Sequence, residues 1–403
     1  MAERAGVNSK GRATLVQVAL MGWVGCIADS RDAATWFGDD IAYRAGVFDL
    51  DMAPLPFLGY LLRQAGSDRP LPIRVARKVG VLLDGGRSVQ QSLRAHCQVT
   101  SEVARRLGLP DETALALRYI FGRWDGKGLP EVAGEDVPRP VRIWQLADVA
   151  DVHFRRGGAD AVEDVVRARR ATAFDPGLVD LLCADIDGVY ADLDNHPAWD
   201  DLAALDPMLA MPLRDSAVDD ALTTVADWVD LKSPWFTGYS RSVADLAEEA
   251  ARRLALPPGQ VRRTRRAALI HGLGRAGIPN TLWDATRPLT TAESERLRLS
   301  SYYTERILAR SPLQGLGEIA ASAHERLDGS GQHRGLTGAM LSTEARILAV
   351  AALWRTKVAD RPHRDALTPG AAADLLRGQA ATGRLDERAV DAVLGAAGQP
   401  RGA

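Results

Sequence analysis

The sequence contains little cysteine, and the few cysteines are scattered. Cys26, Cys97 and Cys183 are the only three in 403 residues, and no two of them form a CxxC pair. An odd, sparse set of this kind excludes a disulfide framework and a cysteine-based zinc site. It fits a reducing compartment, so we expect a cytoplasmic protein.

The sequence also lacks an excess of charge and a long apolar run. Its net charge is -2 and its pI is about 6.4, so no global basic field points to nucleic acid. The opening residues, MAERAGVNSKGR, contain no apolar core of signal-peptide length. The run from Ala13 to Ala28 is apolar but short and includes Gln17, which predicts a buried helix and no membrane span.

Common catalytic signatures are missing as well. No Walker loop, GxSxG elbow or HExxH motif occurs. The acid pairs Asp39-Asp40 and Asp219-Asp220 each precede helical apolar residues, so the simplest interpretation is negative charge at a helix N-terminus.

Helical periodicity is what the sequence does show. Apolar residues recur three and four apart from Val243 to Leu254 and from Ala217 to Val229. Strand alternation and Asn-Gly hairpin signals are not evident. Thr368-Pro369 predicts a helix start, with threonine as N-cap and proline in the first turn. We therefore expect an all-α protein.

The chain repeats itself. FGRWDGKGLPEVAGEDVPRPVRIWQLAD begins at Phe121, and HERLDGSGQHRGLTGAMLSTEARILAVAA begins at His324. Both copies then run into a helix and an aspartate-marked turn, at Asp175 and at Asp386. Two copies of one helical module are expected, with a boundary between His196 and Arg214.

Five segments of the second half follow one another in a recognisable order. They are DLKSPWFTGYSRSVADLA from Asp230, ALIHGLGRAGIPNTLWD from Ala268, SSYYTERIL from Ser300, AHERLDGSGQHRGL from Ala323 and EARILAVAALWRTKVADRPHRDALTP from Glu344. Together they resemble the motifs of the HD-GYP subfamily of HD-domain phosphohydrolases. The resemblance implies two HD-domain-like helical modules packed as a pseudo-duplicate. Residues 1–200 would form a degenerate module without the opening helix, and residues 215–400 a module that keeps part of the motifs.

The chain is also similar to a group of actinobacterial-type regulators that have two such halves followed by a helix-turn-helix domain. This sequence ends at GAAGQPRGA without such a domain. We therefore expect no direct nucleic acid binding.

The HD-GYP resemblance implies hydrolysis of a phosphodiester, commonly in a cyclic dinucleotide, by two or three iron or manganese ions. Such ions lower the pKa of a bound water and neutralise charge on the phosphoryl group. The family holds them with histidine and aspartate side chains, which suit these metals.

Most of those ligand positions carry other residues here. In the second half the family's ligand positions are occupied by Tyr239, His271-Gly272, Ser300, Ala323-His324-Glu325 and Ala352. In the first half Trp23-Val24 replace the HD pair and Ile120-Phe121-Gly122 replace His-His-Glu, while His96 and Asp148 match family positions. Only His271 and His324 stay as weak metal candidates, with Glu325 nearby. The replacements favour aromatic and aliphatic groups.

Two Asp-Gly-x-Gly elements are present although most metal-ligand positions carry other residues. They begin at Asp125 and at Asp328. Glycine permits positive φ and a tight loop there. The element is interpreted either as a structural turn, which we favour, or as a loop that contacts a ligand.

Three functions are compatible with this pattern. The favoured one is a catalytically degenerate HD-GYP-like pseudoenzyme that regulates or binds a ligand. The second is an enzyme that uses the former metal cavity as a metal-free aromatic pocket for proton transfer or cyclisation, with His324, Glu325 and Asp328 as its catalytic groups. The third is a residual metal-dependent phosphodiesterase.

The candidate site residues follow from the same alignment of motifs. The expected ligand pocket of the second module comprises Tyr239, His271, Ser300, Gln332, His333 and Trp354, and that of the first comprises Trp23, His96, Phe121, Asp125 and Asp148. No cofactor is expected, although a single weakly held manganese or iron ion is left open. The expected partner is a small molecule or a protein, not a membrane, and a homodimer is left open.

Overall fold

The computed structural model describes residues 1–47, 50, 54–67, 70–191 and 199–400. The chain is 70% helical, and no strand occurs in those ranges, so the predicted all-α class is confirmed. Within the same ranges, no single helix is long and apolar enough to cross a membrane, although the bent pair Ser9–Ile27 and Ser30–Phe37 together have the length and composition.

The chain divides into two compact units, Met1–Arg214 and Asp215–Ala403, which we call unit 1 and unit 2. The predicted boundary region begins at His196, which lies outside the described residues. Each unit has its own buried apolar clusters, as expected for separately packed helical bodies.

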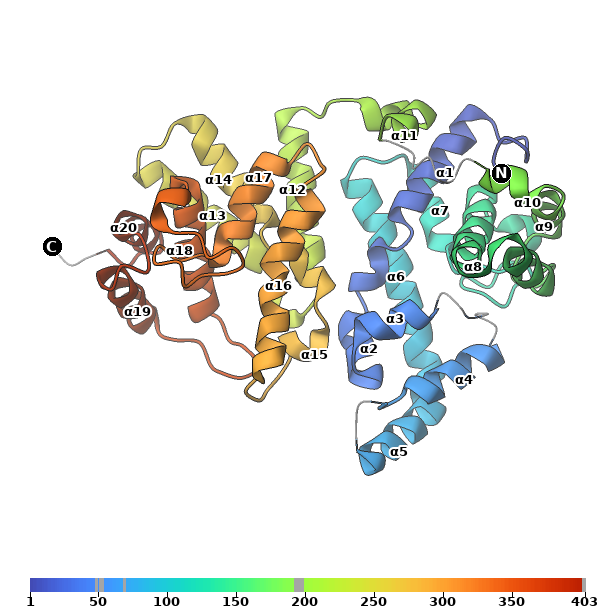
Figure 1. Ribbon diagram of the computed structural model, residues 1–403, viewed down its shortest axis with the longest axis horizontal. Coiled ribbons are helices and arrows are strands. Elements are labelled where there is room, and N and C mark those ends of the chain that lie inside the picture. The colour runs from blue at the N-terminus through green and yellow to red at the C-terminus, as the bar shows by residue number, and fades with distance from the viewer. Residues whose placement is uncertain (48–49, 51–53, 68–69, 192–198, 401–403) are drawn as a thin grey trace. The chain divides into compact units, whose positions relative to one another are not determined.

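Unit 1 is built around the long helices α6 and α8 (Figure 1). α8 contains Gly158, whose φ of 68° breaks the helix. The apolar run from Ala13 gives a helix that ends at Met21 and is followed by the short 3-10 turn η1, Val24–Ile27. The helices are α1 (Ser9–Met21), α2 (Ser30–Phe37), α3 (Asp40–Val47), α4 (Pro54–Gln64), α5 (Leu71–Gly80), α6 (Gly86–Arg106), α7 (Asp111–Ala116), α8 (Arg139–Ala168), α9 (Pro176–Cys183), α10 (Ile186–Tyr190) and α11 (Trp199–Leu205).

Unit 2 is organised around α13, which packs against α14, α18 and α20 (Figure 1). Its inward face is rich in small side chains, and Ala244, Ala247 and Ala250 are completely buried. Small residues let neighbouring helices approach closely, and their burial contributes to the core. The helices are α12 (Asp215–Asp230), α13 (Tyr239–Arg253), α14 (Pro258–Ile270), α15 (Asn280–Trp283), α16 (Thr291–Leu308), α17 (Gln314–Ala321), α18 (Thr343–Lys357), α19 (Pro369–Ala381) and α20 (Glu387–Ala396).

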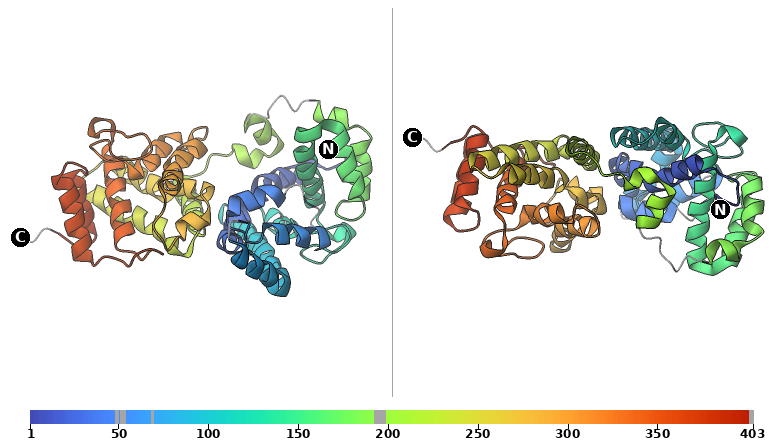
Figure 2. Two further views of the ribbon diagram at one scale, coloured as in Figure 1. Left: turned by 60° about the horizontal axis from the view of Figure 1, so that its bottom comes forward. Right: turned by 90° about the horizontal axis from the view of Figure 1, so that it is seen from above.

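Capping residues set several helix starts in unit 2. Thr368 caps α19, as predicted, and accepts a hydrogen bond from the Ala371 N–H at 3.3 Å. Thr290 and Glu293 form a capping box at α16. α19 and α20, the dark red helices at the C-terminal end in Figure 2, lie side by side.

The same ion pair occurs in both units. In unit 1, Arg142 of α8 contacts Asp175, the N-cap of α9, at 2.5 Å. In unit 2, Arg346 of α18 contacts Asp386, the N-cap of α20, at 2.9 Å. In the sequence repeat, Arg142 matches Arg346 and Asp175 matches Asp386. The duplication of the module stays a prediction.

Candidate functional site

Unit 2 contains a cavity of about 640 Å³ at the position of the HD motif. This volume lies in the range that small-molecule sites occupy. Its lining includes four of the predicted residues, Tyr239, His271, Ser300 and His324. Arg275, Lys357, Arg361, His363 and Arg364 add basic groups, and Trp235, Phe236 and Trp283 add aromatic rings.

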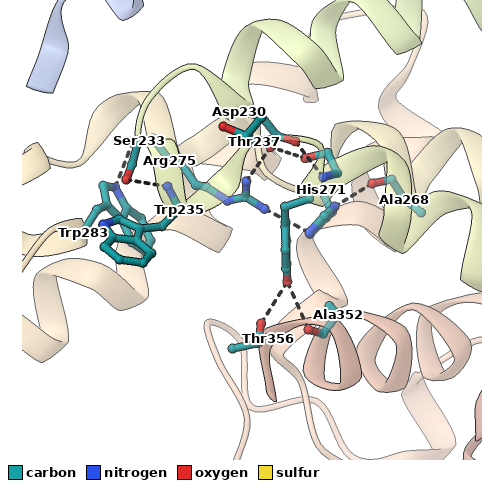
Figure 3. A network of polar contacts seen from close by, with 12 residues as sticks. Asp230, Ser233, Trp235, Thr237, Ala268, His271, Arg275, Trp283, Ala352 and Thr356 are labelled. Carbon is teal, nitrogen blue, oxygen red and sulfur yellow. Dashed lines mark hydrogen bonds and ion pairs between the residues drawn. The ribbon is translucent and has the colours of Figure 1, made fainter. Parts of the chain in front are cut away.

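A buried polar network includes the lining residues His271 and Arg275 (Figure 3). Asp230, the last residue of α12, accepts hydrogen bonds from the Ser240 N–H at 2.8 Å and from the Ser240 hydroxyl at 2.7 Å. Arg275 donates from Nη1 to Asp230 Oδ1 at 2.9 Å. Burial raises the pKa of Asp230, and the adjacent guanidinium is the strongest influence that opposes this rise.

Arg275 occupies the space that an HD aspartate side chain would need. A Cβ atom at Gly272 would lie 2.7 Å from Arg275 Cζ. The second position of the HD pair is therefore glycine, and the guanidinium of Arg275 fills the space beside it. Sequence reasoning missed Arg275; a basic residue three positions after the missing aspartate was the available signal.

His271 is held in one neutral form by its two neighbours. Its Nδ1 lies 2.6 Å from the Ala268 carbonyl, so Nδ1 carries the proton and donates. Its Nε2 then accepts from Arg275 Nη2 at 3.2 Å. Burial, followed by the charge of Arg275, lowers the pKa of His271 well below its usual value. The pKa of His324 falls to about 4, chiefly because it is buried. Both rings are therefore neutral near pH 7.

Two arginines lie over the same aromatic rings. The guanidinium of Arg275 is 4.3 Å from the centre of the Phe236 ring and 4.7 Å from that of Tyr239. The guanidinium of Arg361 is 4.9 Å and 5.1 Å from the same two centres. Tyr239 is fixed by its hydroxyl, which donates to the Ala352 carbonyl at 3.0 Å. Cation–π contacts thus help to hold positive charge at the cavity.

Lys357 at the end of α18 and two arginines of the turn that follows have no acidic partner among the described residues. Within the described ranges, neither Lys357, Arg361 nor Arg364 makes an ion pair with a carboxylate. Arg361 donates to the Trp235 carbonyl, and Arg364 donates to backbone carbonyls of its own turn. Burial lowers the pKa of Arg361 to about 10, with the nearby Arg275 acting in the same direction. The cavity therefore carries uncompensated positive charge.

Two of the predicted catalytic groups lie outside the cavity lining, and this corrects the expectation that they act together with His324. Glu325 is buried and accepts from the Arg334 and Leu336 N–H groups at 2.8 and 3.0 Å, so it organises a loop. Asp328 is bonded to the N–H and hydroxyl of Ser330, and these hydrogen bonds lower its pKa.

Three further predicted pocket residues also lie outside the lining. Trp354 is buried in the apolar core on α18. His333 contacts Glu305 with 2.6 Å between Nε2 and Oε2. The N–H of Gln332, its neighbour, donates to the His324 carbonyl at 3.1 Å. These residues lie near the motif in the sequence, but the contacts just given hold them outside the cavity lining.

The Asp-Gly-x-Gly elements need their two glycines for different reasons. Gly126 and Gly329 have φ values of 75° and 77°, as predicted. A Cβ at Gly128 would lie 2.3 Å from the Phe121 carbonyl oxygen, and one at Gly331 would lie 2.4 Å from backbone atoms. The unit 2 element does not line its cavity, whereas Gly126 and Gly128 line the unit 1 cavity described next.

Unit 1 contains a separate, mostly apolar cavity of about 650 Å³, which we call the unit 1 cavity. Its lining includes three of the predicted residues, Trp23, Phe121 and Asp148. His96 and Asp125 are not part of the lining, which corrects their placement in the pocket.

Both of those side chains are engaged by other groups. His96 lies behind Trp23 and Phe121, with its Nε2 2.8 Å from the Gly22 carbonyl oxygen, and burial lowers its pKa to about 4. Asp125 is held by Arg123 through two hydrogen bonds of 3.0 Å.

Comparison with known proteins finds several sequences that are similar to this chain. Residues 223–389 match the model of the HD domain family. The 3′3′-cGAMP-specific phosphodiesterase 3 of Vibrio cholerae is 29% identical over 349 residues, which are 85% of this chain and 76% of that protein. The cyclic di-GMP phosphodiesterase response regulator RpfG of Xanthomonas campestris is 31% identical over 43% of this chain and 47% of its own length.

A solved structure shares the fold. The crystal structure of the cyclic GMP-AMP phosphodiesterase V-cGAP3 of V. cholerae covers 96% of this chain and 97% of its own, with a TM-score of 0.58 and 24% identity. At this identity the likeness establishes the helical fold and nothing more.

These relatives overturn two expectations. The prediction of a catalytically degenerate pseudoenzyme is wrong because the relatives that match are named as phosphodiesterases, and their names agree instead with the third function considered, a metal-dependent phosphodiesterase. The prediction that no cofactor is needed is wrong because phosphodiesterases of the HD type typically depend on metals.

The donor set does not itself form a metal centre. Across the part of the chain that the structure describes, no group of three or more His, Cys, Asp or Glu side chains is placed to hold an ion. His271 instead accepts from Arg275, which stands between it and Asp230. These residues do not fit a two-metal site.

The domain match and the related sequences nevertheless agree on ancestry. Unit 2 carries an HD domain at residues 223–389, and the chain is homologous to cyclic-dinucleotide phosphodiesterases of the HD-GYP type.

Proposed function

We propose that this protein acts on a 3′3′-linked cyclic dinucleotide, and that the unit 2 cavity holds the phosphodiester. The observation that carries the proposal is the uncompensated positive charge of Lys357, Arg361 and Arg364 at the cavity. These three side chains are partly buried, and partly buried cations without acidic partners attract an anion more strongly than fully solvated ones, because the lower dielectric around them strengthens each contact. Arginine also recognises phosphate oxygens through two parallel hydrogen bonds.

The aromatic side chains of the cavity suit the bases of such a ligand. Trp235 lines the cavity and is 37% exposed, so its face is accessible to a base. Trp283 and Phe236 lie nearby, with 5.3 Å between their ring centres. Stacking of a base on an aromatic ring contributes about 1–3 kcal/mol. Cationic and aromatic groups together match an anionic, ring-containing ligand.

The test is calorimetric titration of the full chain with 3′3′-cGAMP and with cyclic di-GMP. We expect saturable binding that weakens as salt rises, because salt screens the charges. The Arg361→Gln variant is expected to bind at least about tenfold more weakly, the loss of one charged hydrogen bond. Absence of saturable binding of both ligands would overturn the proposal.

A matched control separates the cavity from general surface charge. Arg334 pairs with Glu305 at 3.2 Å and lies outside the cavity lining, so Arg334→Gln is expected to leave the affinity unchanged. Equal weakening by both variants would contradict a site at the cavity. Cleavage to a linear dinucleotide is followed in the same samples with and without added Mn²⁺, because the relatives are named for this reaction.

Location and assembly stay predictions. A cytoplasmic location, a small-molecule or protein partner, a homodimer and a relation to actinobacterial regulators rest on the sequence reasoning given above.

A further inference from the structure

The unit 1 cavity has a chemistry that differs from that of unit 2. α8 lines it with Trp144, Gln145 and Asp148. Trp23, the N-cap of η1, and Phe121, the first residue of the repeated segment, line it as well. The Trp23 and Trp144 ring centres are 5.6 Å apart and tilted by 56°. The Trp23 and Phe121 ring centres are 6.5 Å apart. Aromatic walls of this kind accept a planar apolar group.

A carboxylate without a cationic partner lies at this aromatic wall. Asp148 accepts from Trp23 Nε1 at 3.2 Å, and no ion pair with a lysine or arginine is formed in the described ranges. Three cations also line the cavity: Arg123 is engaged with Asp125, Arg169 donates to the Leu50 carbonyl at 3.1 Å, and Lys127 belongs to the same lining as Glu131. Burial raises the pKa of Asp148, which shows that its environment leaves the negative charge poorly compensated.

Gln145 presents a second acceptor at the same place. Its Nε2 donates to the Ile120 carbonyl at 2.8 Å and to the Gly122 carbonyl at 2.7 Å. Both amide hydrogens are therefore engaged, and Oε1 keeps its capacity to accept. Asp148 and Gln145 therefore favour a ligand that donates hydrogen bonds.

We infer that the unit 1 cavity binds a ring-bearing amine, with its ammonium group at Asp148 and its ring between Trp23, Trp144 and Phe121. An ammonium group gains from the carboxylate and from the faces of the tryptophan rings at once. An anionic ligand such as a cyclic dinucleotide would meet Asp148 unfavourably. The two units therefore recognise ligands of opposite charge.

The experiment compares three probes that share one ring system, using the full chain. Tryptamine is cationic, 3-methylindole is neutral and indole-3-acetate is anionic, and ligand-observed NMR titration gives the affinity of each. We expect tryptamine to bind about tenfold more tightly than 3-methylindole, and indole-3-acetate to bind most weakly. Binding of none of them, equal binding of all three, or preference for the acid would overturn the inference.

Matched variants locate the effect. Asp148→Asn is expected to reduce the preference for tryptamine over 3-methylindole to within about twofold. Asp151→Asn, one turn later on the same helix and paired with Arg155, is expected to keep the full preference. A preference that survives Asp148→Asn, or that is lost in both variants, would count against a site at Asp148.

Two further variants keep the test independent of misfolding and of unit 2. Trp144→Ala is expected to weaken all three probes alike, because it removes a wall of the cavity. Arg361→Gln is expected to leave tryptamine binding unchanged, so failure of cyclic-dinucleotide binding and failure of amine binding are separate results. Thermal unfolding followed by circular dichroism confirms that each variant is folded; a folded Trp144→Ala protein with unchanged binding contradicts the inference.

Discussion

Replacing Arg275 by methionine is expected to destabilise unit 2 strongly at neutral pH. The side chains of Arg275 and Asp230 are only 7% and 4% exposed, and they contact each other at 2.9 Å. Removing one partner of a buried ion pair leaves the other charge uncompensated, which costs about 3–5 kcal/mol. Methionine keeps much of the side-chain volume, so the loss of stability reflects mainly the missing charge and its missing contacts with Phe236 and Tyr239.

The cost should diminish in acid, and the sign follows from Asp230. Burial already holds the pKa of Asp230 above its ordinary value of 3.8, and Arg275 opposes that rise. Without Arg275 the folded-state pKa rises further, so the folded protein binds this proton more tightly than the unfolded chain does. Protonation removes the uncompensated charge. The stability lost in Arg275→Met is therefore largest above the raised pKa and shrinks as the pH falls toward the ordinary value.

Hydrogen exchange measured by mass spectrometry is the suitable assay, because a chain of two units need not unfold in one step. Peptides from α13 and α14 report the local free energy of opening in unit 2, at neutral and at acidic pH. Arg252→Met is the control, since Arg252 contacts Glu248 on an exposed helix face and its loss costs about 0.5 kcal/mol or less. A loss in Arg275→Met no larger than this control, or one that grows in acid, would refute the reasoning.

Two other predictions concern packing and protonation in unit 2. Gly274→Ala is expected to destabilise unit 2 by about 1–3 kcal/mol, because its Cβ would lie 1.8 Å from the Ser300 carbonyl oxygen. Gly378→Ala, which meets nothing within 4 Å in α19, should instead stabilise by up to about 1 kcal/mol; thermal unfolding compares the two, and equal effects would contradict the packing argument. The ring proton signals of His271 and His324 should not titrate between about pH 6 and 8, because burial lowers both pKa values; NMR midpoints near 6.5 would show that the rings are solvated.

Local patterns in the sequence were sufficient for the helices and their starts. The periodicity that begins at Val243 runs along α13 to its C-cap, Leu254, and Thr368 caps α19. Periodicity and capping depend on neighbours in the chain, so they can be predicted from the sequence itself. The glycines Gly126 and Gly329 were predictable for the same reason, because positive φ is a property of one residue in its turn.

The site was predictable only in part. Four motif positions of unit 2 do line one cavity, because helices that belong to one bundle keep their inward faces. Glu325 and Asp328 were expected beside His324, but their oxygens accept hydrogen bonds from loop atoms that spacing does not reveal. Their roles depend on contacts formed by the loop as a whole.

The sequence by itself determined the all-α fold, the repeated motifs and the positions where family ligands are replaced. Only the tertiary structure decided what fills those positions. It placed Arg275 in the space beside Gly272, left Arg361 without an acidic partner and left Asp148 facing aromatic rings. The physical reason is that charge compensation depends on which side chains meet across helices, and such meetings are set by packing and not by local order along the chain.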